Sequence, residues 1–299
     1  MENRTFRVEI TRGMPNADGV SEYVFECAST TNEYNDNFLR GEVRINEVQG
    51  AYRDNCSISI YGLSLKTLMD LTFITWNSQK AVDFRNKLRV KVGEYTIYEG
   101  QIYRAFADFS EAPDVCLRIN GVFGIYIASK SATDKVFLAK DKIKVTQAFN
   151  TLAAEGGLAT VFSKKVAEMN CPDITLNGDL EKQIQMLAKG LRLKHNIMEG
   201  KLYVWAKDED VPQAQTVKID FQNGLIGYPT FWDCGVRFRG IFKPEIRPGN
   251  IIELSSIVPG TMLADEKPRE YLLMAKSSVI STLPNGQWVS DYNCFYRNK

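Results

Sequence analysis

The residue types that most often carry out chemistry are few in this chain, and their spacing matches no common active site. The 299 residues include a single histidine, His195. An HExxH metal site, or any other site built on two histidines, is therefore excluded. His195 lies between Lys194 and Asn196 in a stretch that reads as a hairpin, and we interpret it as an ordinary surface or turn histidine. We expect no catalytic residue of this type and no metal site.

The motifs for serine hydrolysis and for phosphate binding are also missing. The nearest text to the nucleophile elbow GxSxG is GLSLK at residues 62–66, which ends in lysine instead of glycine. Ser64 is better explained as a helix cap, because leucines follow it at helical spacing. Neither GxxxxGK[ST] nor GxGxxG is present, and residues 121–124 lack the strand, turn and helix that would place amides around a phosphate. We expect no cofactor.

Paired carboxylates and alternating aromatic residues have simple structural interpretations. Asp208/Asp210 and Asp265/Glu266 could serve a glycosidase only if two carboxyl groups faced each other across a cleft. Solvated acidic turns are the simpler interpretation. Arginine and aromatic residues alternate over 236–239, which could stack on single-stranded nucleic acid, but a strand with one wet and one packed face explains the same pattern.

Composition indicates a globular chain with no bulk charge. Hydrophobic residues make up 44% and charged residues 24%, and the net charge is +1, so no overall field holds nucleic acid or an anionic membrane. No signal-peptide stretch and no run of about 20 apolar residues is present, which predicts a soluble chain made in the cytosol. The cysteines are widely spaced and form no CxxC pair, which predicts mostly reduced core residues. They are Cys27, Cys56, Cys116, Cys171, Cys234 and Cys294.

Hydrophobic periodicity predicts a β-rich α+β fold in three regions. Residues 1–106 alternate apolar and polar side chains, which indicates a β-barrel or sandwich with one helix inserted at 64–71. Residues 107–212 contain a strand ending in an Asn120-Gly121 turn, then a small α+β domain. Its predicted elements are helices at 145–153 and 180–191, a strand at 159–162 and a hairpin at 193–205. Residues 213–299 return to β patterning and close with a hairpin around Pro284-Asn285-Gly286.

The most informative segment runs from residue 223 to residue 256. It reads as a loop containing Gly227 and Pro229, a strand, a proline-bounded turn, and a second strand after Pro248-Gly249. The segment resembles the "LIGYPTF, GV, P-x-I-x-PG-x-x-I-x-L-x-S" stretch of phage baseplate hub proteins related to the central hub of phage T4. That superfamily includes late control protein D and the N-terminal half of valine-glycine-repeat secretion spikes. The matching structural residues are Gly227, Tyr228, Pro229, Phe231, Gly235, Val236, Pro244, Ile246, Pro248 and Gly249.

Two shorter stretches support the resemblance: residues 108–119, and the terminal hairpin with Gly286-Gln287-Trp288. The resemblance implies two tube-like antiparallel β-barrel domains with the small α+β domain between them. It also implies a homotrimer whose pseudo-sixfold ring joins the hexameric tail tube, or a tube-initiator hexamer, to the trimeric central spike. Other implied contacts are a tape-measure protein and DNA passing through the bore.

The resemblance further implies a place in the virion, at the tail baseplate of a contractile tail, after assembly in the host bacterial cytoplasm. The expected role is structural and not enzymatic. Two alternatives stay open at this point. One is a tail-associated peptidoglycan hydrolase subunit, and the other is a β-rich module that binds sugar or single-stranded nucleic acid.

Overall fold

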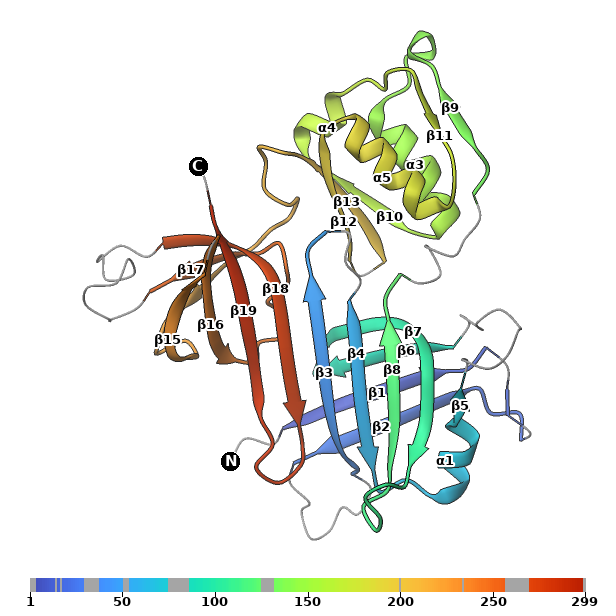
Figure 1. Ribbon diagram of the computed structural model, residues 1–299, viewed down its shortest axis with the longest axis vertical. Coiled ribbons are helices and arrows are strands. Elements are labelled where there is room, and N and C mark those ends of the chain that lie inside the picture. The colour runs from blue at the N-terminus through green and yellow to red at the C-terminus, as the bar shows by residue number, and fades with distance from the viewer. Residues whose placement is uncertain are drawn as a thin grey trace. The chain divides into compact units, whose positions relative to one another are not determined.

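The computed structural model describes most of the chain (Figure 1). The described residues are 4–13, 15–16, 18–29, 38–50, 54–74, 86–124, 132–198, 200–232, 234–255 and 269–297. They form two compact units. The first is made of Met1–Val48, Arg53–Phe123 and Thr216–Lys299, and the second of Gln49–Tyr52 and Gly124–Gln215. The predicted β-rich α+β class is confirmed, whereas the predicted three-domain division stays a prediction.

The first unit contains two lobes. The N-terminal lobe consists of β1 (Thr5–Thr11), β2 (Glu22–Ala28), β3 (Arg40–Val48), β4 (Asn55–Tyr61), α1 (Leu65–Leu71), β5 (Phe73–Ile74), β6 (Lys87–Val92), β7 (Tyr95–Asp108) and β8 (Cys116–Val122). The C-terminal lobe consists of β14 (Thr216–Ile219), β15 (Leu225–Trp232), β16 (Gly235–Ile241), β17 (Ile251–Leu254), β18 (Arg269–Ser281) and β19 (Trp288–Tyr296). Figure 1 shows these as blue-to-teal and orange-to-red strands.

The two lobes repeat the same arrangement of five strands. The sheet order is β3-β4-β8-β7-β6 in the N-terminal lobe and β15-β16-β19-β18-β17 in the C-terminal lobe, and all these neighbours are antiparallel. In each lobe the five strands also follow one another in the same order along the chain. β15 therefore corresponds to β3, and β18 corresponds to β7.

The correspondence extends to single residues. The long strand of each lobe has a register shift directly after the residue that starts the bulge, Ile102 in β7 and Leu273 in β18. Each of these residues donates its backbone N–H to an asparagine carbonyl at 2.9 Å, Asn86 in one lobe and Asn250 in the other. The sequence shows no residue-level repeat, so only the backbone pairing reveals this duplication.

Each lobe has its own hydrophobic core. Inward residues of β1, β3, β4, β6, β7 and β8 build the N-terminal core, among them Val43 and Ile45, which are 0% and 1% exposed. Residues of β15 to β19, including Val236 and Tyr292, build the C-terminal core. Burial of these alternating apolar side chains supplies most of the stability of such sheets.

A continuous sheet joins the two lobes. β3 pairs antiparallel with the second half of β18, from Val48↔Ala275 to Glu42↔Ser281. The resemblance implies two β-barrel domains, but among the described strands the path of the large sheet runs through both lobes and is not closed. The prediction differs from the structure here because β3 uses one of its edges to pair with the other lobe.

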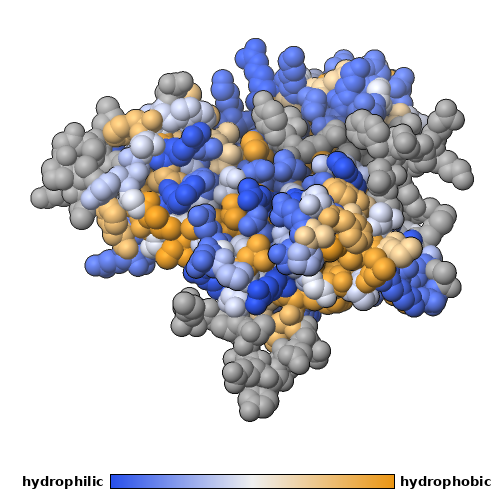
Figure 2. Space-filling model, turned by 60° about the horizontal axis from the view of Figure 1, so that its bottom comes forward, coloured by the Kyte–Doolittle hydropathy of each residue, from blue (hydrophilic) through white to orange (hydrophobic). Residues whose placement is uncertain are grey.

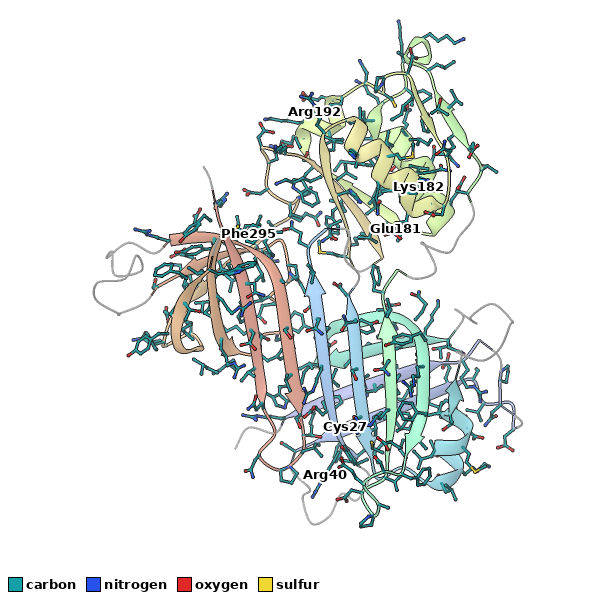
Figure 3. The ribbon with its side chains drawn as sticks, viewed as in Figure 1. Cys27, Arg40, Glu181, Lys182, Arg192 and Phe295 are labelled. Atoms are coloured by element: carbon teal, nitrogen blue, oxygen red, sulfur yellow. The ribbon has the colours of Figure 1, made fainter. Side chains whose placement is uncertain are left out.

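A single bridge brings the two ends of the N-terminal lobe together. Leu39, which directly precedes β3, forms a parallel bridge with Cys27 of β2, and Ala28 donates its N–H to the Leu39 carbonyl at 3.1 Å. Figure 3 labels Cys27 and Arg40 at this end of the lobe. The strands of this lobe therefore curve almost back onto themselves.

The second unit is the predicted small α+β domain. Its elements are β9 (Lys135–Phe137), a 3-10 turn η2 (Ala139–Asp141), α3 (Val145–Gly156), β10 (Ala159–Phe162), α4 (Lys164–Glu168), β11 (Ile174–Leu176), α5 (Leu180–Gly190), β12 (Leu193–Met198) and β13 (Lys201–Ala206). Apolar faces of α3 and α5 share a core with β10 and β13. Both helices, the strand and the hairpin predicted for this region are confirmed.

Two local predictions need separate comment. Ser64 caps α1 as predicted, accepting the Thr67 N–H at 3.2 Å. The predicted Asn120-Gly121 turn is wrong, because both residues lie inside β8. A Cβ at Gly121 would lie 2.9 Å from the Tyr98 hydroxyl and 3.0 Å from a Leu88 methyl, so the glycine serves close packing and not a turn.

The chemically reactive residues are placed as follows. Among the six cysteines, Cys234 is exposed and the others are buried, which confirms the predicted core role for most of them. His195 lies within β12 opposite Val204 and is partly buried, so it is a strand residue and not a turn residue. Burial lowers the pKa of His195.

Candidate assembly surface

The structure divides the residues predicted from the family motif between two neighbouring places. Gly227, Tyr228, Pro229 and Phe231 lie on β15, and Gly235 and Val236 begin β16. Pro244, Ile246, Pro248 and Gly249 lie in the segment 242–250 between β16 and β17, which we call the clasp segment. The four β15 residues lie on an exposed strand edge, whereas Gly235 and Val236 are buried beside it. The four residues of the clasp segment lie at the junction of the two lobes.

β15 is an edge strand with an apolar surface. It pairs with β16 on one side, and no other described strand pairs with it. Seven of its eight residues are at least partly exposed. Four of its large hydrophobic side chains are exposed to solvent: Ile226 by 40%, Tyr228 by 63%, Phe231 by 47% and Trp232 by 41%. We call these four residues the β15 patch. A long exposed apolar edge is a typical site of protein association.

The sequence predicts a loop around Gly227 and Pro229, but the structure has a strand with an irregularity there. The pairing with β16 breaks between Ile226 and Thr230. Gly227 has a φ of 69°, which favours glycine, and Pro229 has no N–H to offer a neighbouring strand. The middle of the edge therefore cannot extend a regular ladder, although its side chains remain available.

Packing on β16 and β19 holds the β15 edge in place. A Cβ at Gly235 would lie 1.9 Å from the Cys294 carbonyl oxygen, so only glycine fits at the start of β16. Trp232 contacts Phe295 of β19, labelled in Figure 3, with ring centroids 5.6 Å apart. Tyr228 meets Phe221 edge-to-face at 5.6 Å. These contacts give the exposed aromatic residues fixed positions.

The clasp segment binds the two lobes to each other through a buried charge cluster. Arg247 donates to Glu47 of β3 at 2.6 Å and to the Ile97 carbonyl of β7 at 2.8 Å. It also donates to the Thr96 carbonyl. One carboxylate and two backbone carbonyls of the N-terminal lobe thus accept hydrogen bonds from one guanidinium of the C-terminal lobe. Planar arginine donors suit such a fixed arrangement.

Lys276 of β18 completes the cluster from the other side. The Lys276 side chain is 1% exposed. Its Nζ donates to the Ile246 carbonyl at 2.8 Å and to the Lys243 carbonyl at 3.2 Å, and it lies 3.6 Å from the Glu47 carboxylate. The ammonium also lies 4.9 Å from the centre of the Phe242 ring. Burial lowers the pKa of Lys276 to about 8, even though Glu47 acts to raise it.

Backbone geometry fixes the end of the clasp segment. Gly249 has a φ of 96° and donates its N–H to the Leu273 carbonyl at 2.7 Å. The Asn250 side chain accepts the Arg247 N–H at 2.7 Å, and Ile246 is fully buried in the C-terminal core. The Pro248-Gly249 turn of the motif therefore holds the Arg247 side chain and the Ile246 carbonyl in position at the junction of the two lobes.

A groove of about 600 Å³ lies next to the β15 patch, between the two lobes of the first unit. Ile226, Ile241 and Trp288 give it an apolar lining, together with Arg4 and Arg239. Both arginines have partners, because Arg4 donates to the Gly286 carbonyl at 3.0 Å and Arg239 pairs with Asp291 at 2.7 Å. Its described lining residues include no paired acid and base, so this part of the groove suits packing better than catalysis.

The remaining chemical candidates do not gather into a site. Asp208 forms an ion pair with Lys165, and Asp265 and Glu266 lie outside the described residues. Across the described ranges, no group of three or more metal-ligating side chains comes together. In the same part of the chain, no helix has both the length and the apolar character needed to cross a bilayer.

Sequence reasoning missed Glu47, Arg247 and Lys276. Arg247 lies inside the motif, between Ile246 and Pro248, but nothing in the amino-acid sequence shows which residues it contacts. Lys276 takes an inward position on β18, but only because the bulge after Leu273 shifts the alternation by one residue, which the sequence does not show. A charged residue at an inward strand position indicates a buried pair.

The fold and the motif region match known tail proteins. A family model described as Baseplate hub gp41 matches residues 22–263. The tail protein of Neisseria meningitidis MC58 has a TM-score of 0.62 at 13% identity, with 97% of this chain and 96% of that chain covered. The 43 kDa tail protein of prophage MuSo2 from Shewanella oneidensis has a TM-score of 0.58 at 8% identity, with 97% and 98% covered.

A third solved structure extends the likeness to secretion systems. The Escherichia coli c3393 protein has a TM-score of 0.55 at 7% identity, with 87% of this chain and 74% of that chain covered. It is described as a component of the type VI secretion system with structural similarity to the T4 bacteriophage tail proteins gp27 and gp5. A comparison with curated protein sequences finds no match.

Proposed function

Since the chain belongs to the baseplate hub gp41 family, a family of structural tail proteins, we propose that three copies form a pseudo-sixfold ring. In this proposal the ring joins the hexameric tail tube, or a tube-initiator hexamer, to the trimeric central spike. The observation that carries the proposal is the repeated five-strand arrangement of the two lobes.

Symmetry explains why a duplicated chain suits this place. A trimer of single-lobed chains would present three equal faces, whereas a trimer of two-lobed chains presents six similar ones. Such a ring can match a sixfold partner on one side and a threefold partner on the other. The Cys27–Leu39 bridge supports a barrel-like N-terminal lobe, and the shared topology supports the same shape for the C-terminal lobe.

The buried cluster at the junction supports a rigid building block. Glu47, Arg247 and Lys276 hold the two lobes of one chain in a fixed relation, with side-chain exposures of 7%, 20% and 1%. A ring that transmits force between tube and spike needs such fixed relations within each subunit. The family-motif residues of the clasp segment thereby gain a structural role in the proposal.

The remaining partners follow from the proposed place in the tail. The bore of the ring would let DNA pass during genome ejection, and the net charge of +1 suits passage without strong binding. A tape-measure protein would occupy the bore before ejection. The protein would act in the virion after assembly in the host bacterial cytoplasm.

Mass measurement and electron microscopy of the purified protein test the proposal. We expect particles of three 33.9 kDa chains, and class averages with six similar lobes around a central opening. Adding the spike protein of the same tail should give a complex of one trimer with one spike trimer. Single chains at all concentrations up to tens of micromolar, with and without the spike, would overturn the ring.

A further inference from the structure

We propose that the subunits of this ring join head to tail, with the β15 patch of one copy packing on α1 of the N-terminal lobe of the next copy. The inference rests on the proposed trimer and names the surfaces that hold it together. The occupant of the β15 patch is thus a second copy of this chain.

The junction inside one chain provides the template. There, β3 of the N-terminal lobe lies along β18 of the C-terminal lobe. Because β15 corresponds to β3 and β7 corresponds to β18, the equivalent junction between two chains places β15 of one copy beside β7 of another. Three junctions within chains and three between chains then alternate around the ring.

The exposed fractions of corresponding residues show that no strand covers β15 in the way that β18 covers β3. Two equivalent rows of paired residues cross the lobes: Ile45, Cys56, Gly121 and Ile102 in the N-terminal lobe, and Phe231, Val236, Cys294 and Leu273 in the C-terminal lobe. Ile45 is 1% exposed, whereas its counterpart Phe231 is 47% exposed. Cross-strand partners share a face, so Phe231 lies on the same face as the buried Val236 but at an open edge.

The receiving side of the junction is also apolar and exposed. The stretch of β7 that corresponds to the β3-binding part of β18 pairs with β5, and α1 packs against β7. α1 buries Leu68 and Leu71 and leaves Leu65 and Met69 60% and 69% exposed. Phe109, directly after β7, is 53% exposed. We call Leu65, Met69 and Phe109 the α1 patch.

The two patches occupy different sides of the first unit. Figure 2 shows hydrophobic residues gathered on the β15 side at the left and on the α1 side at the right, with hydrophilic residues between them. Two different apolar patches on one chain are what a heterologous, ring-forming contact requires. A patch that served one isologous dimer would need no counterpart elsewhere on the chain.

The contact must be made by side chains and not by a shared backbone ladder. On the receiving side, Phe73 of β5 pairs with Ala105, and Ala107 donates its N–H to the Thr72 hydroxyl at 3.1 Å. On the incoming side, Pro229 and the register break interrupt β15. The edge of β7 is therefore already occupied at Ala105 and Ala107, and a regular ladder cannot run through the middle of β15, while the exposed aromatic and aliphatic side chains remain. Aromatic residues at the centre of an interface carry most of its binding energy.

Two charge substitutions test the head-to-tail arrangement. Tyr228→Glu damages the β15 patch and Met69→Glu damages the α1 patch. Val136→Glu, in the second unit, is the matched control, because Val136 is 60% exposed. Circular dichroism checks that each variant is folded, and sedimentation velocity measures the number of chains. We expect each patch variant to need roughly 100-fold more protein for trimer formation, since a charge would be buried in the contact, and the control to form trimers normally.

Mixing the two patch variants separates this arrangement from others. The intact β15 patch of the Met69→Glu chain can still dock on the intact α1 patch of the Tyr228→Glu chain, but the second junction is blocked. We therefore expect a one-to-one heterodimer that does not close into a ring. Trimers from the separate variants, or no heterodimer in the mixture, would overturn the inference and leave the proposed trimer intact. A wild-type chain that never forms trimers would instead overturn the proposed function.

Discussion

The N-terminal and C-terminal lobes share five strands in the same order, but their corresponding first strands, β3 and β15, have different surroundings. β3 is covered by β18 and buries Val43 and Ile45. β15 has no such neighbour within the described residues and exposes four large hydrophobic side chains. The difference teaches that one strand position can stabilise the fold in one lobe and serve assembly in the other.

The connection that follows the second strand of each lobe differs as well. In the N-terminal lobe this connection contains α1 and β5, and in the C-terminal lobe it is the clasp segment. Phe73 of β5 pairs with Ala105, whereas Lys276, the counterpart of Ala105, pairs with Glu47 of β3. A small residue in one lobe thus corresponds to a buried cation in the other, which is where the two lobes are fixed together.

The largest effect is expected from breaking the buried cluster. Glu47→Ala would leave Arg247 and Lys276 buried without their carboxylate, so we expect the free energy of unfolding to fall by about 3–5 kcal/mol. Urea denaturation followed by tryptophan fluorescence measures the change. Glu26→Ala, which breaks the exposed pair with Arg7, is the control and should change stability little. Equal stability of the two variants would show that sheet pairing alone joins the lobes.

The tight contact at the start of β16 should give a similar but smaller effect. Gly235→Ala places a methyl group against the Cys294 carbonyl, and we expect a loss of about 3 kcal/mol. The exposed side chain of Asn55, the counterpart of Gly235 in β4, accepts a hydrogen bond from the exposed Asn46 side chain at 3.0 Å. Asn55→Ala should therefore stay within about 0.5 kcal/mol of the wild type. A wild-type Tm for Gly235→Ala would contradict the assigned packing role.

Truncating the equivalent residues Ile45 and Phe231 compares the two edges directly. Ile45→Ala should cost about 3 kcal/mol, because it opens a cavity in a closed core. Phe231→Ala should change the stability of the single chain by no more than about 0.5 kcal/mol, yet weaken trimer formation. Both substitutions are measured in a Met69→Glu background, so that unfolding of single chains is compared. Similar losses for the two would mean that Phe231 already has a core role within its own lobe.

The smallest expected effect is a gradual change of the free energy of unfolding with pH. Burial raises the pKa of Asp54, which accepts the Val48 N–H at 3.0 Å, from 3.8 to about 7. The folded state then holds this proton more tightly than the unfolded state, so the free energy of unfolding falls as pH rises from 3.8 to about 7. Lys276 acts in the opposite direction at higher pH. Its pKa is lowered from 10.5 to about 8, so stability rises between about pH 8 and 10.5.

Two variants separate these contributions. Asp54→Asn should flatten the acidic slope of the free energy of unfolding, and Lys276→Met should flatten the alkaline slope. Guanidinium denaturation at half-unit pH steps measures both. If Asp54→Asn keeps the acidic slope of the wild type, another group is responsible for it.

Much of the secondary structure follows from the sequence because its signals are local. Period-two alternation predicts β1, β2, β4 and β6. Apolar stripes predict α1, α3 and α5, with a serine cap before α1 and glycines near the ends of α3 and α5. The terminal hairpin is also predicted correctly, since Asn285 takes the positive φ of 61° that its turn requires. The turn predicted at Gly121 is wrong because a glycine needed for packing looks the same in sequence as a glycine needed for a turn.

The motif residues illustrate the boundary between the two kinds of information. Sequence text alone singles out Gly227 to Gly249 as unusual, and it identifies the kind of protein through that resemblance. It does not tell which of these residues are exposed, because exposure depends on which strands become neighbours. β3 (RGEVRINEV) alternates charged or polar residues with apolar ones, whereas β15 (LIGYPTFW) carries no charge. Only the pairing of β3 with β18 shows that β3 is covered and that β15 is left open.

The sequence by itself determined that this chain is a globular β-rich protein without the usual catalytic motifs, because composition, periodicity and motif spacing are properties of neighbouring residues. Only the tertiary structure decided that the two β regions are versions of one arrangement, that Glu47, Arg247 and Lys276 meet at their junction, and that β15 is left as an apolar edge. Those facts depend on contacts between residues as far as 239 positions apart, such as Glu42 and Ser281. No local pattern encodes such contacts, because their free energy arises only when the sheet has formed.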